Sequence, residues 1–137
     1  MTQNTKSIGI AYADQNIEGA NTVQAEQTLG FTSAGQSAVT QATSKATGVT
    51  TTTPVSIITM NAASLATVTT VAFTLTNPRI KVGDQILVSH SSAGTAGGYN
   101  VWANTVANGS AVIQVRNITA GPLAEAIVLT VTVLSSS

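Results

Sequence analysis

The dipeptide Asn108-Gly109 lies between two stretches in which apolar and polar residues alternate, residues 98–107 and residues 110–116. Asparagine and glycine accept the positive φ angles of tight turns, so this dipeptide between alternating runs is the strongest short-range signal for a β-hairpin. Alternation with a period of two places successive side chains on opposite faces of a strand. The sequence therefore predicts a hairpin here, and we take it as the feature around which the chain is organised.

The length of the turn decides which side chains of this hairpin face the core. A two-residue loop pairs Ala107 with Ser110 and places Trp102 on the apolar face. A three-residue loop, with Gly109 as a left-handed bulge, pairs Val106 with Ser110 and moves every side chain to the other face. We favour the three-residue loop because it separates apolar from polar residues more cleanly: Tyr99, Val101, Ala103, Ala111, Ile113 and Val115 inward, and Asn100, Trp102, Asn104, Gln114 and Arg116 outward.

Four further stretches have the pattern of strands, at residues 55–60, 71–76, 85–90 and 126–134. Asn77-Pro78 ends the second of them, because proline has no amide hydrogen for the ladder. No convincing helical pattern interrupts the series. Short strands joined by turns are typical of an antiparallel β-sandwich or a jelly-roll-like domain. We therefore expect an all-β fold in which residues 49–137 form that domain.

Residues 1–48 differ from the rest of the chain, because they are rich in small and uncharged polar residues and their larger apolar residues are scattered. Within them, residues 7–12 alternate and predict one short strand. The segment has too little apolar surface to fold alone, so we interpret it as an extended N-terminal arm that orders against another surface. A flexible tail is the alternative, since chain ends are often disordered. Leu29 and Phe31 are the candidate contact residues of this arm.

The polar surface of this protein depends on uncharged residues, because only 7% of the chain is charged and the formal net charge is zero. Soluble domains ordinarily carry about 25% charged residues. So weak a field cannot hold nucleic acid by its phosphates, whereas low charge repulsion suits copies that pack in an assembly. The chain has no apolar run of the roughly 18 residues that span a bilayer and no signal-peptide pattern. We expect a protein made in the cytoplasm that binds neither nucleic acid nor membrane.

The ionisable residues form no recognisable catalytic or metal-binding set. His90 is the only histidine, and Ser89 points to the opposite face of the same strand, so we expect His90 to bond backbone groups near the strand end. One histidine without any cysteine does not make a metal-ligand set. The acids are too scattered for the paired carboxylates of a glycosidase: Asp14, Glu18, Glu26, Asp84 and Glu125. We therefore predict that the protein is not an enzyme and has no cofactor.

Five short segments, taken in order, carry a likeness to a known family: Thr43-Ser-Lys-Ala-Thr-Gly48, Ile58-Thr-Met-Asn-Ala-Ala63, Val71-Ala-Phe-Thr-Leu-Thr-Asn77, His90-Ser-Ser-Ala-Gly-Thr-Ala-Gly-Gly-Tyr99 and Gly121-Pro-Leu-Ala-Glu-Ala126. This order resembles a β-module found in structural proteins of tailed bacteriophages and prophages. The likeness covers roughly residues 43–134, and its best signal is the loop and strand from Ser91 to Val101. Modules of that family decorate virion surfaces or form part of fibres, usually as trimers. The resemblance therefore implies a structural role in a virion.

Trp102 is the only tryptophan and the most informative candidate contact residue. In the favoured register it shares an exposed strand face with Asn100, Asn104, Gln114 and Arg116. An outward tryptophan is either a contact anchor, as at interface hot spots, or a platform on which a sugar stacks. If the two-residue register holds instead, Trp102 belongs to the core.

Together with the resemblance, these features predict a capsid decoration (cement) protein located on the capsid surface of a virion and made in the host cytoplasm. We expect it to bind the major capsid protein as a homotrimer and to reinforce the shell through many weak polar and apolar contacts. The alternative is a fibre or head-spike module whose Trp102 face binds a host-surface glycan.

Overall fold

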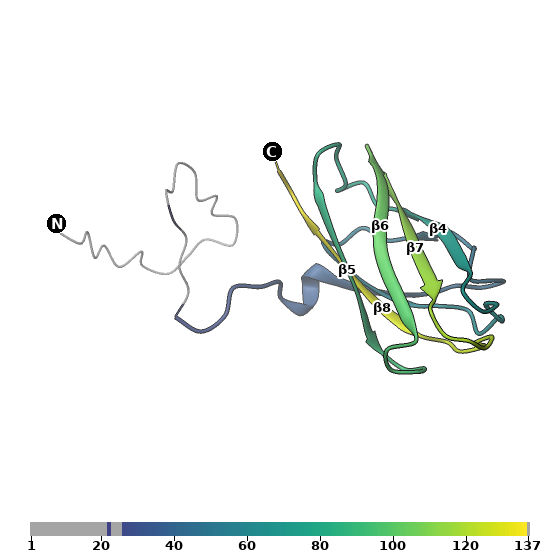
Figure 1. Ribbon diagram of the computed structural model, residues 1–137. Coiled ribbons are helices and arrows are strands. Elements are labelled where there is room, and N and C mark those ends of the chain that lie inside the picture. The colour runs from purple at the N-terminus through teal and green to yellow at the C-terminus, as the bar shows by residue number, and fades with distance from the viewer. Residues whose placement is uncertain (1–21, 23–25, 137) are drawn as a thin grey trace, which may run out of the picture. The chain divides into compact units, whose positions relative to one another are not determined.

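The computed structural model of the chain describes Thr22 and residues 26–136. The chain divides into two compact units, Met1–Gly30 and Phe31–Ser137. In the first unit the described residues, Thr22 and 26–30, are exposed and form no helix or strand. The predicted strand at residues 7–12 lies outside the described residues. The second unit, called the β-domain below, holds every strand of the described residues (Figure 1). In this part of the chain, no helix has the length and apolar character to cross a membrane.

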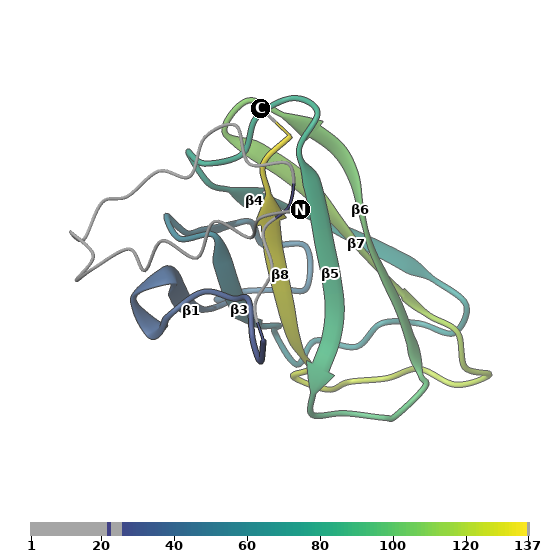
Figure 2. The same ribbon diagram turned by 90° about the vertical axis from the view of Figure 1, so that its left-hand side faces the viewer.

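The described β-domain contains one short 3-10 helix and eight strands: η1 (Ser33–Gly35), β1 (Gln36–Thr40), β2 (Val49–Thr50), β3 (Val55–Thr59), β4 (Thr70–Thr76), β5 (Gln85–Ser92), β6 (Tyr99–Ala107), β7 (Ser110–Asn117) and β8 (Val128–Leu134). Sheet A has the strand order β1-β3-β8-β5, and sheet B has the order β2-β4-β7-β6. Figure 2 shows β3, β8 and β5 of sheet A in front of β4 and β7 of sheet B. The prediction of an all-β fold with two packed sheets, a β-sandwich, is confirmed.

Two strand pairs run parallel, so the prediction of a purely antiparallel sandwich was wrong. β1 is parallel to β3 and β2 is parallel to β4, while the other pairs in the two sheets are antiparallel. The chain passes from β1 in sheet A to β2 in sheet B and returns to β3, which lies beside β1. Parallel neighbours need such a crossover connection. Sequence patterns do not reveal this crossover because β2, Val49–Thr50, is too short to show alternation.

The core lies between the two sheets and takes alternate side chains from their strands. In β7 and β8, inward residues are buried and outward residues are mostly half-buried. The residues predicted to face inward in β7 are buried (Ala111, Ile113 and Val115), and so are the alternate residues of β8 (Leu129, Val131 and Val133). Burying one Val, Leu or Ile side chain fully stabilises the fold by about 1.5–3 kcal/mol. The two strands, which lie inside their sheets rather than at an edge, therefore hold the sandwich together.

The hairpin of β6 and β7 turns through a two-residue loop, so the predicted three-residue loop was wrong. Ala107 pairs with Ser110, and the extra residue lies inside β6, where a bulge at Thr105 shifts the register. Thr105 has a φ angle of 33°, which is unusual for a β-branched residue. From Asn104 back to Tyr99 the pairing is nevertheless the predicted one. The prediction placed the extra residue in the turn and the structure places it within β6, and both positions shift the rest of the strand by one residue. The predicted inward and outward faces are therefore confirmed.

The loop after β4 fixes this turn as a short one. The N–H of Gly109 (φ 82°) donates to the carbonyl of Ile80 at 2.9 Å, and the N–H of Asn77 donates to the carbonyl of Gly109 at 2.8 Å. The side-chain oxygen of Asn108 accepts from the N–H of Val82 at 3.2 Å. These contacts hold Asn108-Gly109 as the two-residue turn, so the extra residue is accommodated in β6. The contacts join distant parts of the chain, and local sequence does not reveal them.

The β-domain begins before residue 49, so the predicted boundary at residue 48 falls inside it. β1 pairs with β3 over its whole length. In the loop after β1, Gln41 and Lys45 are buried, and the side-chain amide of Gln41 donates to the carbonyls of Lys45 (3.1 Å) and Thr47 (2.8 Å). Sequence patterns missed residues 36–48 because hydrogen bonds hold their loop in place and because Val39 is the only large apolar residue of β1.

Candidate interaction surfaces

The outer face of sheet B brings together five of the candidate contact residues. Trp102 lies opposite Gln114, Asn100 lies opposite Arg116, and Asn104 lies opposite Val112 in the next row. Trp102 has an exposed fraction of 37%, so it is not a core residue. We call this surface the Trp102 face and define it by Asn100, Trp102, Asn104, Gln114 and Arg116.

The neighbouring strand β4 continues the Trp102 face with small side chains. Ala72 lies opposite Gln114 and Thr70 lies opposite Arg116. The amides of the face both donate and accept hydrogen bonds, the guanidinium only donates, and the indole offers one donor and a flat ring. Arg116 is the only Lys, Arg, Asp or Glu in the strands that the structure describes. This surface is therefore equipped for stacking and hydrogen bonding rather than for charge pairing.

The outer face of sheet A is more apolar. We call it the apolar face and define it by Val55, Ile57, Leu87, Val128 and Leu134. In one row Val55 and Leu87 lie on either side of Thr132. Leu87 has an exposed fraction of 54%. The sequence already contained a sign of this face, because the last predicted strand carries apolar residues on both of its sides.

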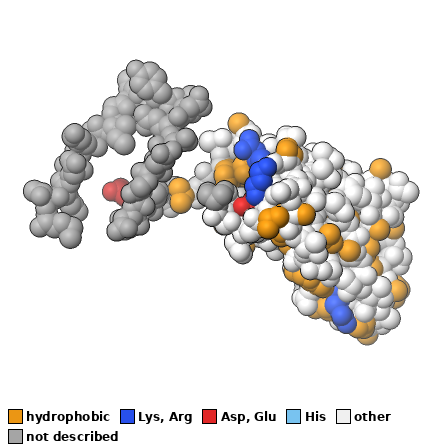
Figure 3. All heavy atoms as spheres, turned by 90° about the horizontal axis from the view of Figure 1, so that it is seen from above, with side chains coloured by type: hydrophobic (Ala, Val, Ile, Leu, Met, Phe, Trp, Pro, Cys, Tyr) orange, Lys and Arg blue, Asp and Glu red, His pale blue; other side chains and the backbone are white. Residues whose placement is uncertain are grey.

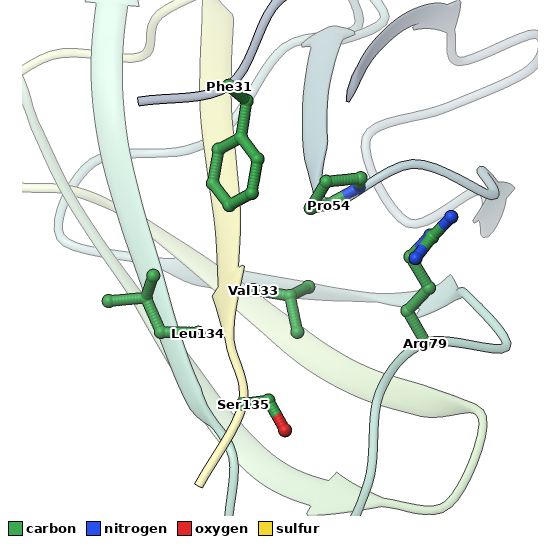
Figure 4. Close-up of a pocket in the computed structure, with 6 residues that line it drawn as sticks. All are labelled: Phe31, Pro54, Arg79, Val133, Leu134 and Ser135. Atoms are coloured by element: carbon green, nitrogen blue, oxygen red, sulfur yellow. The ribbon is translucent and has the colours of Figure 1, made fainter. Parts of the chain in front are cut away.

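A pocket of about 390 Å³ adjoins the apolar face at the end of β8, and Leu134 belongs to both. Figure 4 shows its lining side chains: Phe31, Pro54, Arg79, Val133, Leu134 and Ser135. Phe31 thus lies beside sheet A and does not belong to the Trp102 face. Leu29 belongs to the first unit, where its side chain is 78% exposed.

Glu125 anchors the loop between β5 and β6 to the segment before β8. Its carboxylate accepts hydrogen bonds from the N–H (2.9 Å) and the hydroxyl (2.7 Å) of Thr95 and from the hydroxyl of Tyr99 (2.9 Å). These bonds, those from Thr95 first, hold the pKa of Glu125 below its usual range. Burial, followed by the bond to Glu125, raises the pKa of the Tyr99 hydroxyl, which therefore stays protonated and donates. The cluster fixes the start of β6 and hence one end of the Trp102 face.

His90 packs against the ring of Tyr99. The two rings meet edge to face, with centroids 5.6 Å apart and an interplanar angle of 82°. Nε2 of His90 lies 2.7 Å from the carbonyl oxygen of Ala93, so the predicted bond to a backbone group is confirmed. His90 also lines a pocket of about 310 Å³ with the small residues of its loop. These contacts of His90 position the loop. The carboxylate of Glu125 accepts hydrogen bonds from Thr95 and Tyr99.

The remaining acids of the described chain do not gather into a site. The carboxylate of Asp84 accepts from the N–H groups of Lys81 (2.8 Å) and Ser136 (3.1 Å), which lower its pKa. Glu26 is exposed in the first unit. Asp14 and Glu18 lie outside the described residues. Among the residues that are described, no group of three or more His, Cys, Asp and Glu side chains is placed to hold a metal ion.

Lys45 is buried at the end of the sandwich where Glu125 lies. No sequence pattern predicts its burial. Its Nζ donates to the carbonyls of Asn61 (2.6 Å) and Glu125 (2.5 Å), which lie 16 and 80 positions away in the chain. Burial lowers the pKa of this ammonium group, and the charge of Glu125 opposes that shift. Because both acceptors are backbone groups distant in the chain, the burial of this lysine is evident only from the folded structure.

Figure 3 shows the β-domain from above, with uncharged surface broken by small groups of Lys and Arg side chains. Comparisons with protein families, with curated proteins and with solved structures found no match to this chain. The two sheet faces are therefore interpreted from their own residues.

Proposed function

We propose that this chain is a bacteriophage capsid decoration (cement) protein, which binds the shell of the major capsid protein as a homotrimer and stabilises it. The single observation that carries the proposal is the Trp102 face, a sheet surface with an exposed tryptophan at an edge strand. The location in the virion and the jelly-roll-like character of the domain belong to the same proposal. It draws further support from the resemblance to virion β-modules.

The composition of the Trp102 face suits attachment to a repeating protein surface. Tryptophan is enriched among interface residues that carry most of the binding energy, and ordinary interfaces combine such anchors with a polar, hydrated rim. Here Asn100, Asn104 and Gln114 supply that rim around the indole. A homotrimer presents three copies of the face, so modest single contacts add up through effective concentration.

The first test measures how many copies a virion carries. Quantitative mass spectrometry of purified virions, from the phage whose genome encodes this chain, gives the ratio of this protein to the major capsid protein. Hundreds of copies in a simple ratio to the shell protein would support decoration. Absence from the particles would contradict any virion role, and a few dozen copies would contradict decoration and favour a fibre part.

The second test removes the anchor. Trp102→Ala should weaken co-sedimentation with particles stripped of this protein at least tenfold, because truncating an interface hot spot costs about 2 kcal/mol or more. Val82→Ala is the matched control, since Val82 is an exposed apolar residue that belongs to no sheet face. Equal binding by Trp102→Ala and the wild-type chain would contradict the role of the Trp102 face.

The same face favours a second function, a fibre or head-spike module that binds a host-surface glycan. The indole of Trp102 is flanked along β6 by Asn100 and Asn104, and across the ladder by Gln114. Amide groups donate to and accept from sugar hydroxyls, while a flat ring receives the apolar side of a sugar. A glycan array probed with the wild-type chain and with Trp102→Ala separates the two functions. Binding that Trp102→Ala loses supports the glycan module, and an array without signal contradicts it.

A further inference from the structure

We propose that the apolar face of sheet A binds further copies of this chain, so that three β-domains turn this face toward a common threefold axis. The inference deepens the proposed function by naming the surface through which the homotrimer forms, and it rests on that function for the number three. The Trp102 face, on the other sheet, then remains available for the shell or for a glycan.

Large apolar side chains stand on this face without full cover from the rest of the described chain. Leu87 and Leu134 are exposed, and Val55, Ile57 and Val128 are half-buried beside them. The threonines between them, Thr130 and Thr132, are half-buried as well and add methyl groups. A contiguous apolar patch of this kind marks an interaction surface more often than free surface.

The absence of charge on this face favours a second copy of this chain as the occupant. β1, β3, β5 and β8 contain no Lys, Arg, Asp or Glu at all. A strongly charged partner would find no counter-charge on this face, whereas a copy of the same face meets it without like-charge repulsion. Association of this kind is held by apolar burial and by hydrogen bonds between hydroxyl groups, and electrostatic steering contributes little to it.

The size of the face sets the expected strength of the association. Four strands about 4.8 Å apart, each with about five residues of 3.3 Å rise, span a face of roughly 300 Å². Stable complexes bury about 800 Å² on each partner, so one face alone supports only weak association. The pocket lined by Phe31 and Leu134 extends the surface at one end. Arg79 also lines this pocket, outside the uncharged strands, and its guanidinium donates to the carbonyl of Thr52 at 2.7 Å. We therefore expect association in the micromolar range, which attachment to a particle strengthens through avidity.

The test places a charge on the face. Sedimentation equilibrium of the full chain at about 1–100 µM should show a monomer–trimer equilibrium. Leu87→Lys should raise the concentration at which trimers form at least tenfold. β5 is an edge strand, where lysine is well tolerated, so this variant should unfold at the wild-type temperature. Val82→Lys, at a residue that is 68% exposed and lies outside the strands, should associate like the wild-type chain.

A labelling experiment tells a second copy from any other cover. The chain has no cysteine, so Leu87→Cys and Val82→Cys each carry a single thiol. Maleimide should label Leu87→Cys slowly at high protein concentration and quickly after dilution, while Val82→Cys reacts quickly at both. Equally slow labelling of Leu87→Cys at both concentrations would mean that the chain covers its own face and would overturn the proposal, as would a wild-type chain that stays monomeric.

The two proposals fail in different ways. If the chain forms trimers through Leu87 but is absent from virions, the proposed function is contradicted and the proposed interface is supported. A chain that decorates virions but is monomeric at 100 µM, or whose Leu87→Lys variant associates unchanged, keeps the function and loses the interface named here.

Discussion

The two sheets of this sandwich share a core, yet their outer faces differ in chemistry. Sheet B presents Trp102 among amides, threonines and one guanidinium, whereas sheet A presents Leu87, Leu134 and β-branched residues without any charge. Both faces come from strands whose inward residues are mostly apolar. The difference therefore does not arise from folding, which needs only one apolar face per sheet. We expect the two faces to meet different partners.

Among single substitutions, the greatest loss of stability is expected at Asn117, which is buried at the end of β7. Its side-chain amide donates to the carbonyls of Leu65 (3.0 Å), Ala66 (3.2 Å) and Gly121 (2.8 Å), and its oxygen accepts from Thr119. Asn117→Ala removes all of these hydrogen bonds, although the carbonyls of Leu65 and Gly121 still accept from the N–H of Leu123 and the hydroxyl of Thr119. The loss should lower the free energy of unfolding by about 3 kcal/mol. Urea denaturation of the full chain measures this loss.

The same variant also tests whether the two sheets loosen separately. Because Asn117 pairs with Tyr99 at the start of β6, amide hydrogen exchange should accelerate more in β6 and β7 than in β3 and β8. Asn100→Ala is the matched control, since the exposed Asn100 lies on the outer side of the same sheet and such changes usually stay within about 0.5 kcal/mol. Uniform acceleration in both sheets would show that the faces loosen together.

A smaller effect is expected from Glu125, which holds the start of the Trp102 face but does not belong to the apolar face. Its folded-state pKa lies below the unfolded value, so its stabilisation is complete above the unfolded pKa and is lost as pH falls through the folded pKa. The urea midpoint of the wild-type chain should therefore drop as the solution is made more acidic than pH 4.5, the reference value of this carboxyl group.

Glu125→Gln should lower the midpoint at pH 7, because one of its side-chain acceptors becomes a donor facing Thr95 and Tyr99. Its midpoint should also change less than that of the wild-type chain on acidification. Glu26→Gln, a change at an exposed carboxylate of the first unit, should follow the wild-type curve throughout. Parallel curves for Glu125→Gln and the wild-type chain would show that the carboxylate charge is not what fixes this loop.

Much of the fold could be predicted from alternation alone. Six of the strands and the sides of the hairpin that face the core follow from residues such as Ile113, Val115 and Leu129, which recur with a period of two. Alternation does not predict segments that are buried although few of their residues are apolar. β1 has one large inward side chain, and Lys45 is buried against backbone carbonyls from distant segments. Neither feature leaves a local pattern.

The candidate surfaces divide in the same way. The outward position of Trp102 could be predicted, because it depends only on which residues face the core. The cluster of Glu125, Thr95 and Tyr99 could not, since two turns that are far apart in sequence bring it together. The predicted loop length of the hairpin was wrong for a related reason, because hydrogen bonds to Ile80 and Asn77, which lie outside the hairpin, fix the turn.

The smallest effect is expected from deleting Thr105, and it tests the register on which the Trp102 face depends. Without this residue, Val106 would follow Asn104 directly along the ladder, and every other residue from Tyr99 to Ala107 would keep its present partner on β7. The deletion removes a residue whose φ is 33° and should change the free energy of unfolding by no more than about 1 kcal/mol, since it relieves local strain and loses one exposed side chain.

Deleting Ala103 instead provides the matched contrast, because it removes one residue from the same strand on the other side of the bulge. If the bulge at Thr105 stayed, Tyr99 and Val101 would turn outward and Trp102 inward. If the bulge were lost instead, the polar Asn104 would take the inward place of Ala103 opposite Ile113. We expect this variant to lose several kcal/mol, in line with displaced core side chains, and its tryptophan fluorescence should shift to shorter wavelength if it folds. If both deletions were tolerated equally, the strand would not be held in one register, and a fixed Trp102 face would not distinguish sheet B from sheet A.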